Sequence, residues 1–70
     1  MNVGLKKAIE KAGNQEQLAF MLGVHPPRIT YWKQNGLTLK WMYKIHKTMK
    51  IKISDFFVYE GFSDDDIHSL

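Results

Sequence analysis

The chain has 70 residues, a formal net charge of +3, 44% hydrophobic residues and no cysteine. This length allows one small domain with a single hydrophobic core, and the lack of cysteine excludes disulfide bonds and thiolate metal sites. No apolar run reaches the roughly 18 residues of a membrane-spanning helix, and the N-terminus lacks the apolar region of a signal peptide, so we expect a soluble cytoplasmic protein.

The first predicted element is a helix from Met1 to Gly13. Its apolar residues recur three and four positions apart, as on a helix with one buried face. Lysines and Glu10 take the outer face. Gly13 is expected to end the helix. The residues expected to be buried are Leu5, Ala8, Ile9 and Ala12.

Residues 15–22 predict a second helix. Asn14 is a favourable N-cap, and Gln17 stands where a capping-box partner would lie. Gly23 is expected to end the helix because glycine tolerates positive φ at a C-cap. The apolar face consists of Leu18, Ala19 and Leu22.

A third helix is predicted to begin at Pro26 and Pro27 and to end near Asn35-Gly36. Proline suits a first turn because the N–H it lacks would have no intrahelical partner there. His25 is the expected boundary residue, since a residue before proline is disfavoured in the α region. The buried stripe of this helix consists of Ile29 and Trp32.

A fourth helix is predicted from Thr38, a plausible N-cap, to about Met49. It carries two stripes of residues spaced three to four apart. The apolar stripe is Leu39, Met42, Ile45 and Met49, and the basic stripe is Lys40, Lys44 and Lys47. The basic stripe is either a solvated face or a phosphate contact.

Residues 50–53 alternate like a short strand, whereas Ser54 resembles the cap of a short helix. We favour the short helix, because a lone strand would have no partner unless a second subunit supplied one. Several aromatic residues follow, and we expect them to cover the core or to mark a dimer seam. These residues are Phe56, Phe57, Tyr59 and Phe62.

Charge is distributed unevenly along the chain. Residues 1–50 hold nine lysines and arginines against two acidic residues, a net charge of +7, whereas residues 51–70 hold one lysine against five acidic residues, a net charge of −4. A basic body suits a polyanionic partner. We therefore predict a domain over residues 1–60 and an acidic tail over residues 61–70 that is either a short helix or disordered.

Residues 15–34 resemble the helix-turn-helix of the phage repressor and Cro-like superfamily, and are most similar to small YdaS-type and Cro-type prophage regulators. The resemblance has a steric basis, since two helices joined by a short turn need a small residue near the bend and apolar residues between them. It implies an all-α fold, a compact four- to five-helix lambda-repressor-like helix-turn-helix domain. The matching residues are Gln15, Ala19, Gly23, Ile29 and Trp32.

In this superfamily the second helix of the motif enters the major groove and its outward residues reach base edges. At 100° per residue, the face opposite Ile29 and Trp32 points outward. The base-reading residues expected here are Pro26, Pro27, Thr30, Tyr31 and Gln34. The residues expected to contact phosphates are Gln15, His25, Arg28, Lys33 and Lys40.

Three positions depart from the family pattern. A serine or threonine cap is common where this chain has His25. Polar readers commonly stand where this chain has Pro26 and Pro27, and proline offers only apolar contact, for instance to a thymine methyl group. Readout by hydrogen bonds would therefore fall to Thr30, Tyr31 and Gln34, with Arg28 as a further candidate. We expect fewer base-specific hydrogen bonds and a larger share of affinity from phosphates and DNA shape.

We predict a transcriptional regulator that binds double-stranded DNA sequence-specifically. The family resemblance implies a Cro-like repressor of phage or prophage type. It would bind as a homodimer with two recognition helices about 34 Å apart. The alternative is an antitoxin or other protein-interaction module that binds a protein partner through the acidic, aromatic tail.

An enzyme is not expected. The sequence contains no phosphate-binding glycine loop, no H-E-x-x-H motif and no cysteine nucleophile. The run Asp64-Asp65-Asp66 lacks the alternating ligand spacing of a calcium loop. We therefore predict no cofactor and no metal site.

Overall fold

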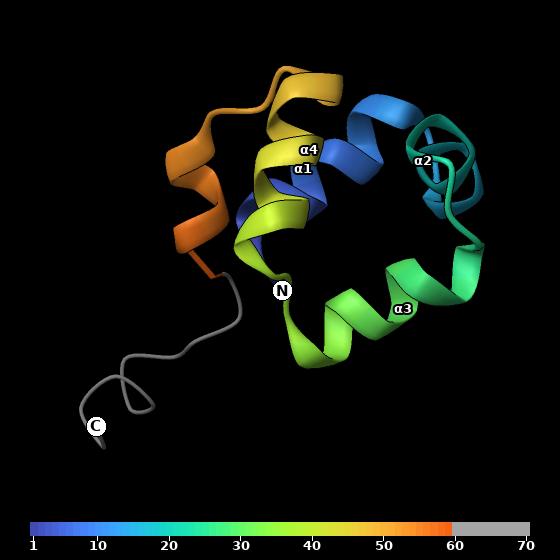
Figure 1. Cartoon of the computed structure of the whole chain (residues 1–70), viewed down its shortest axis with the longest axis horizontal. Coiled ribbons are helices and arrows are strands. Elements are labelled where there is room, and N and C mark those ends of the chain that lie inside the picture. Colours follow the sequence, from blue (N-terminus) through green and yellow to red (C-terminus); the bar gives the residue numbers. More distant parts are fainter. Residues whose placement is uncertain (60–70) are drawn as a thin grey trace.

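The computed structural model describes residues 1–59, which form four α-helices followed by one 3₁₀ helix (Figure 1). Residues 1–59 contain no β-strand, only an isolated antiparallel bridge between Asn2 and Tyr59. The predicted all-α class is confirmed, while the predicted tail, residues 61–70, lies outside the described residues. The elements are α1 (Val3–Ala12), α2 (Gln15–Leu22), α3 (Pro26–Asn35), α4 (Leu39–Met49) and η1 (Ile53–Phe57).

Side-chain caps explain where three of the helices begin. The side-chain oxygens of Asn2, Asn14 and Thr38 accept hydrogen bonds from backbone N–H groups of the first turns, at 3.1, 2.8 and 3.4 Å. Each such cap stabilises a helix by about 1 kcal/mol. At α3, His25 makes no side-chain cap, and proline occupies the first helical positions instead.

Left-handed backbone residues end two of the helices. Gly23 ends α2 with φ of 71°, a conformation that glycine adopts without steric cost. Lys50 ends α4 with φ of 56° and is the only residue other than glycine with positive φ between residues 1 and 59. A side chain in this conformation is strained by roughly 1 kcal/mol.

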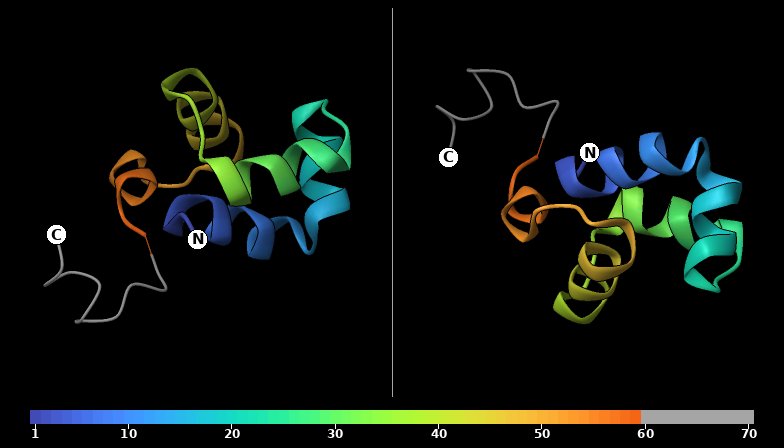
Figure 2. Two further views of the ribbon diagram at one scale, coloured as in Figure 1. Left: turned by 90° about the horizontal axis from the view of Figure 1, so that it is seen from below. Right: turned by 90° about the horizontal axis from the view of Figure 1, so that it is seen from above.

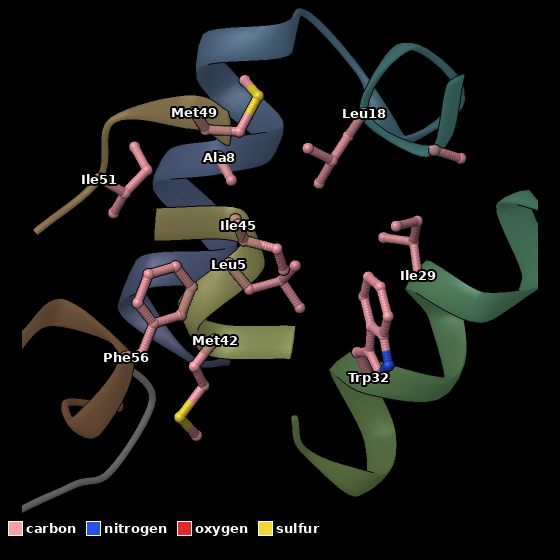
Figure 3. Close-up of a cluster of buried hydrophobic side chains, with 11 residues drawn as sticks. Leu5, Ala8, Leu18, Ile29, Trp32, Met42, Ile45, Met49, Ile51 and Phe56 are labelled. Carbon is pink, nitrogen blue, oxygen red and sulfur yellow. The ribbon is translucent and has the colours of Figure 1, made fainter. Parts of the chain in front are cut away.

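One hydrophobic core joins all five elements (Figure 3). Phe56 of η1 is fully buried and lies against α1 so closely that a Cβ on Gly4 would be 2.5 Å from its ring. Gly4 therefore makes room for the largest of the fully buried side chains. The core residues are Leu5, Ala8, Leu18, Ala19, Ile29, Trp32, Met42, Ile45, Met49, Ile51 and Phe56.

Two details of the sequence prediction are wrong. Leu39 is 69% exposed, because it lies in the first turn of α4, beyond the core. Ser54 is no cap, since η1 begins at Ile53 without a side-chain cap. Of the aromatic residues expected to cover the core or to mark a dimer seam, Phe56 covers the core. Phe57 and Tyr59 are exposed, so a dimer seam stays a prediction for them, and Phe62 lies outside the described residues.

The arrangement places α2 at one end of the molecule, and η1 with the start of α1 at the other (Figure 2). The two termini of the described chain meet at the end that holds η1, where Asn2 pairs with Tyr59. The Asn2 side chain donates from Nδ2 to the Phe56 carbonyl oxygen at 2.6 Å, and Val3 N–H donates to the Val58 carbonyl oxygen at 2.8 Å. Between residues 1 and 59, no helix has the length and apolar character needed to cross a membrane.

Candidate functional site

The turn between α2 and α3 fixes how α3 projects from the body. Within the turn, Gly23 and Val24 donate backbone hydrogen bonds to the carbonyl oxygens of Phe20 and Ala19, at 3.2 and 2.9 Å. Ala19 is 1% exposed and belongs to the core that α2 shares with α3. Of the other residues that match the family motif, Ile29 and Trp32 are buried, whereas Gly23 is exposed in the turn.

The opposite face of α3 is open to solvent. All five predicted base-reading residues are exposed, and the Tyr31 side chain is 59% exposed. The same helix therefore carries an anchored stripe and a free face, as its periodicity predicted. The exposed residues are Pro26, Pro27, Thr30, Tyr31 and Gln34.

The predicted phosphate-contacting residues come from three helices. Gln15 lies half-buried in the first turn of α2, and Lys40 lies exposed in the first turn of α4. The other three flank the free face of α3 and are exposed: His25, Arg28 and Lys33.

Arg28 has partners that the sequence did not indicate. Its guanidinium carbon lies 5.4 Å from the Trp41 ring centroid and 6.0 Å from that of Trp32. The two indole rings are 5.0 Å apart, and Lys44 Nζ lies 4.8 Å from the Trp41 centroid. Cation–π contacts at exposed sites contribute about 0.5–1 kcal/mol each. Trp41 thus contacts both Arg28 of α3 and Lys44 of its own helix, α4.

Beside this cluster, α2 and α4 enclose a groove of about 480 Å³, here called the apolar groove. Met21 and Tyr43 are about half exposed within it, and Lys47 Nζ lies 5.3 Å from the Tyr43 ring centroid. The sequence analysis did not predict the groove, because it depends on how two helices pack. Its lining residues are Met21, Leu22, Trp41, Tyr43, Lys44, Lys47 and Thr48.

A second hollow of about 450 Å³ lies at the C-terminal end of α4, and is here called the basic hollow. Three of its five lining residues are lysines. His46 Nδ1 lies 2.6 Å from the Ile51 carbonyl oxygen, which fixes the ring against the chain that leaves the helix. The lining residues are His46, Lys47, Lys50, Ile51 and Lys52.

The described residues are strongly basic. All ten lysines and arginines of the sequence fall within residues 1–59, against Glu10, Glu16 and Asp55, a net charge of +7. Asp55 forms an ion pair with Lys7 at 3.0 Å and so is already neutralised. Among residues 1–59, no cluster of three or more histidine and acidic side chains has an arrangement that could hold a metal ion.

Comparison with known proteins identifies no relative. No protein-family model matches the chain, and neither a curated protein nor a solved structure gives a significant match.

Proposed function

We propose that this protein is a sequence-specific DNA-binding transcriptional regulator with a lambda-repressor-like helix-turn-helix, formed by α2, the turn at Gly23 and α3. The observation that carries the proposal is the division of α3 into a buried stripe and an exposed polar face flanked by cations. A helix fits the major groove of B-DNA, where its outward side chains meet base edges.

In this proposal three residues read bases by hydrogen bonding. Thr30, Tyr31 and Gln34 each carry a donor and an acceptor and lie on the exposed face of α3. Pro26 and Pro27 offer only apolar contact at the start of the helix, where they would select for a thymine methyl group.

Phosphate contacts would position α3 and supply most of the affinity. Arg28 is the strongest candidate, because the Trp41 ring restricts its side chain before DNA arrives. A restricted side chain loses less conformational freedom on binding. The other proposed phosphate contacts are Gln15, His25, Lys33 and Lys40.

We further propose that the protein acts in the cytoplasm as a homodimer, as a Cro-like repressor of phage or prophage type. A single short helix reads few base pairs, whereas two related by a two-fold axis read both halves of a palindromic operator. The sequence resemblance supports this setting.

Binding selection from a random pool of duplex DNA, at about 150 mM salt, tests the proposal, because non-specific electrostatic binding is weak there. We expect an enriched two-fold symmetric site with half-sites about one helical turn apart. Weak binding without enrichment, strongly reduced by salt, would overturn the proposal and favour the protein-interaction module.

A further inference from the structure

The end of α4 is built differently from the ends of the other three α-helices. Gly13, Gly23 and Gly36 are the C-caps of α1, α2 and α3, each with positive φ, whereas Lys50 caps α4 with φ of 56°. Glycine adopts a left-handed conformation without steric cost, and lysine does not. Because strained residues of this kind concentrate at functional sites, the Lys50 side chain is a candidate for a role of its own.

Three hydrogen bonds hold the turn that follows α4. The His46 carbonyl oxygen accepts from the backbone N–H groups of Lys50 and Ile51, the second at 3.3 Å. His46 Nδ1 lies 2.6 Å from the Ile51 carbonyl oxygen, and since a carbonyl group only accepts, the ring donates. Ile51 is buried in the core. The backbone that carries the basic hollow is therefore fixed before any ligand binds.

Three ammonium groups surround the basic hollow. Lys47, Lys50 and Lys52 line it, and no ion pair joins them to a carboxylate of residues 1–59. The C-terminal end of a helix carries a dipole equivalent to about half a negative charge. Three positive charges exceed this, so the hollow attracts anions, and it attracts ions with several charges most strongly.

We propose that the basic hollow binds a small anion with two or three linked phosphate groups, which pair with Lys47, Lys50 and Lys52. The inference goes beyond DNA binding and does not depend on it. Lysine binds phosphate as a point charge, without the fixed geometry of arginine. The volume of about 450 Å³ falls within the usual range for small-ligand sites.

The position of the hollow favours a small anion over the duplex proposed for α3. Figure 1 shows the C-terminal end of α4 and the helix α3 on opposite sides of the molecule. Lys40, the phosphate contact proposed on α4, lies in the first turn of that helix, whereas Lys50 follows its last turn. The rise of an α-helix separates these two positions by about 15 Å. A duplex across α3 and Lys40 would therefore leave the hollow accessible to another ligand.

Titration of the full chain with inorganic triphosphate, without DNA and at about 150 mM salt, tests the proposal. We expect saturable binding by calorimetry, with the largest NMR shifts at the backbone amides of His46, Ile51 and Lys52. Signals of Thr30 and Tyr31, exposed on α3, should not move. Inorganic monophosphate should bind about tenfold more weakly, because it meets fewer lysines. Absence of saturable binding, or shifts spread evenly over the surface, would overturn the proposal.

Substitution of Lys50 separates its charge from its backbone conformation. Lys50→Gly relieves the strain, so the urea midpoint of unfolding should rise, while the affinity for triphosphate should fall about fivefold. Lys47→Ser and Lys52→Ser should each weaken binding by a similar factor. The control Lys11→Ser removes the same charge from an exposed site outside the hollow and should change affinity by less than about twofold.

The same variants test whether Lys50 only stabilises the end of α4 through the helix dipole. In that case Lys50→Gly would lower the urea midpoint and change the affinity for triphosphate no more than Lys11→Ser does. That result would overturn the proposal.

Further ligands distinguish other occupants of the hollow. Adenosine triphosphate should bind within about threefold of inorganic triphosphate, because recognition depends on the phosphate groups, and adenosine should not bind. Binding of adenosine at a similar affinity would overturn the phosphate assignment. Signals of His46 and Lys52 that respond to duplex DNA, but never to triphosphate, would assign the hollow to a DNA backbone and equally overturn the proposal.

Discussion

At the scale of single residues, Arg28 links the exposed face of α3 to α4 through the Trp41 ring. If Arg28 contacts a phosphate, Arg28→Ala should weaken binding to every DNA sequence alike. The slope of log affinity against log salt should become shallower by about one, as expected for one lost phosphate contact. Titrations at several salt concentrations measure both effects.

Two control variants separate charge from position. Lys11→Ala removes a cation from the exposed face of α1 and should leave the salt slope unchanged. Arg28→Lys keeps the charge but loses the planar stacking group, so it should recover the slope better than the affinity. Relaxed preference at one base pair, without a change of slope, would show that Arg28 reads a base instead.

Tyr31 is the largest exposed side chain on the free face of α3, at 59% exposure. Tyr31→Ala should change sequence preference at one position of each half-site, because this side chain is proposed to meet a base edge. Tyr31→Phe separates the hydroxyl group from the ring and should relax only a preference that depends on hydrogen bonding. Repeating the binding selection with each variant measures this, and an equal loss of affinity on all DNA contradicts base reading by Tyr31.

At the scale of helices, Asn2 and Asn14 are two caps in different surroundings. Asn14 is exposed and only caps α2, so Asn14→Ala should destabilise the fold by about 1 kcal/mol. Asn2 is 3% exposed, caps α1 and also donates to the Phe56 carbonyl oxygen. Because Asn2→Ala also leaves that carbonyl without its donor, it should cost about 2–4 kcal/mol. Urea unfolding of both variants provides the comparison, and equal losses would show that the Phe56 contact contributes little.

The contact between α1 and η1 can be tested by a substitution at Gly4. Alanine at Gly4 gains about 1 kcal/mol of helix propensity, but its Cβ would overlap the fully buried Phe56 ring. Overpacking typically costs about 1–3 kcal/mol, and three ring atoms within 2.7 Å of the added Cβ place this site at the upper end of that range. After the gain in helix propensity, we expect a net loss of about 1–2 kcal/mol. Glu10→Ala on the exposed face of the same helix is the control and should change stability by less than about 0.5 kcal/mol. A Gly4→Ala variant as stable as that control would show that Phe56 moves freely.

The helices were predictable because their signals are local. The caps Asn14 and Thr38, the prolines that start α3, and the spacing of Ile29 and Trp32 all act within a few residues. The exposed face of α3 follows from the same periodicity.

Contacts between distant residues were not predictable. The pairing of Asn2 with Phe56, and the position of Arg28 over Trp41, depend on how complete helices pack. The same holds for the apolar groove between α2 and α4. Leu39 illustrates the opposite failure, since it has the spacing of a core residue but lies beyond the end of the core.

At the scale of the whole molecule, the proposed operator contact requires two copies. With a two-fold symmetric duplex we expect two chains per site, with recognition helices about 34 Å apart. Light scattering of the complex gives the stoichiometry, and changing the half-site spacing by half a helical turn should abolish tight binding. One chain per site, or tolerance of that spacing change, would contradict the dimer.

The hydrogen bond between Asn2 and Phe56 also has a consequence for the order of folding during synthesis. These residues are 54 positions apart, so α1 leaves the ribosome before the ring that fills its surface and the carbonyl group that binds Asn2 have been made. The α2–α3 pair involves only neighbouring residues and can assemble earlier, whereas contacts so distant in sequence form late. The face of α1 that receives Phe56 therefore stays uncovered until translation has passed η1, and a nascent chain halted before that point exposes this face to chaperones and proteases.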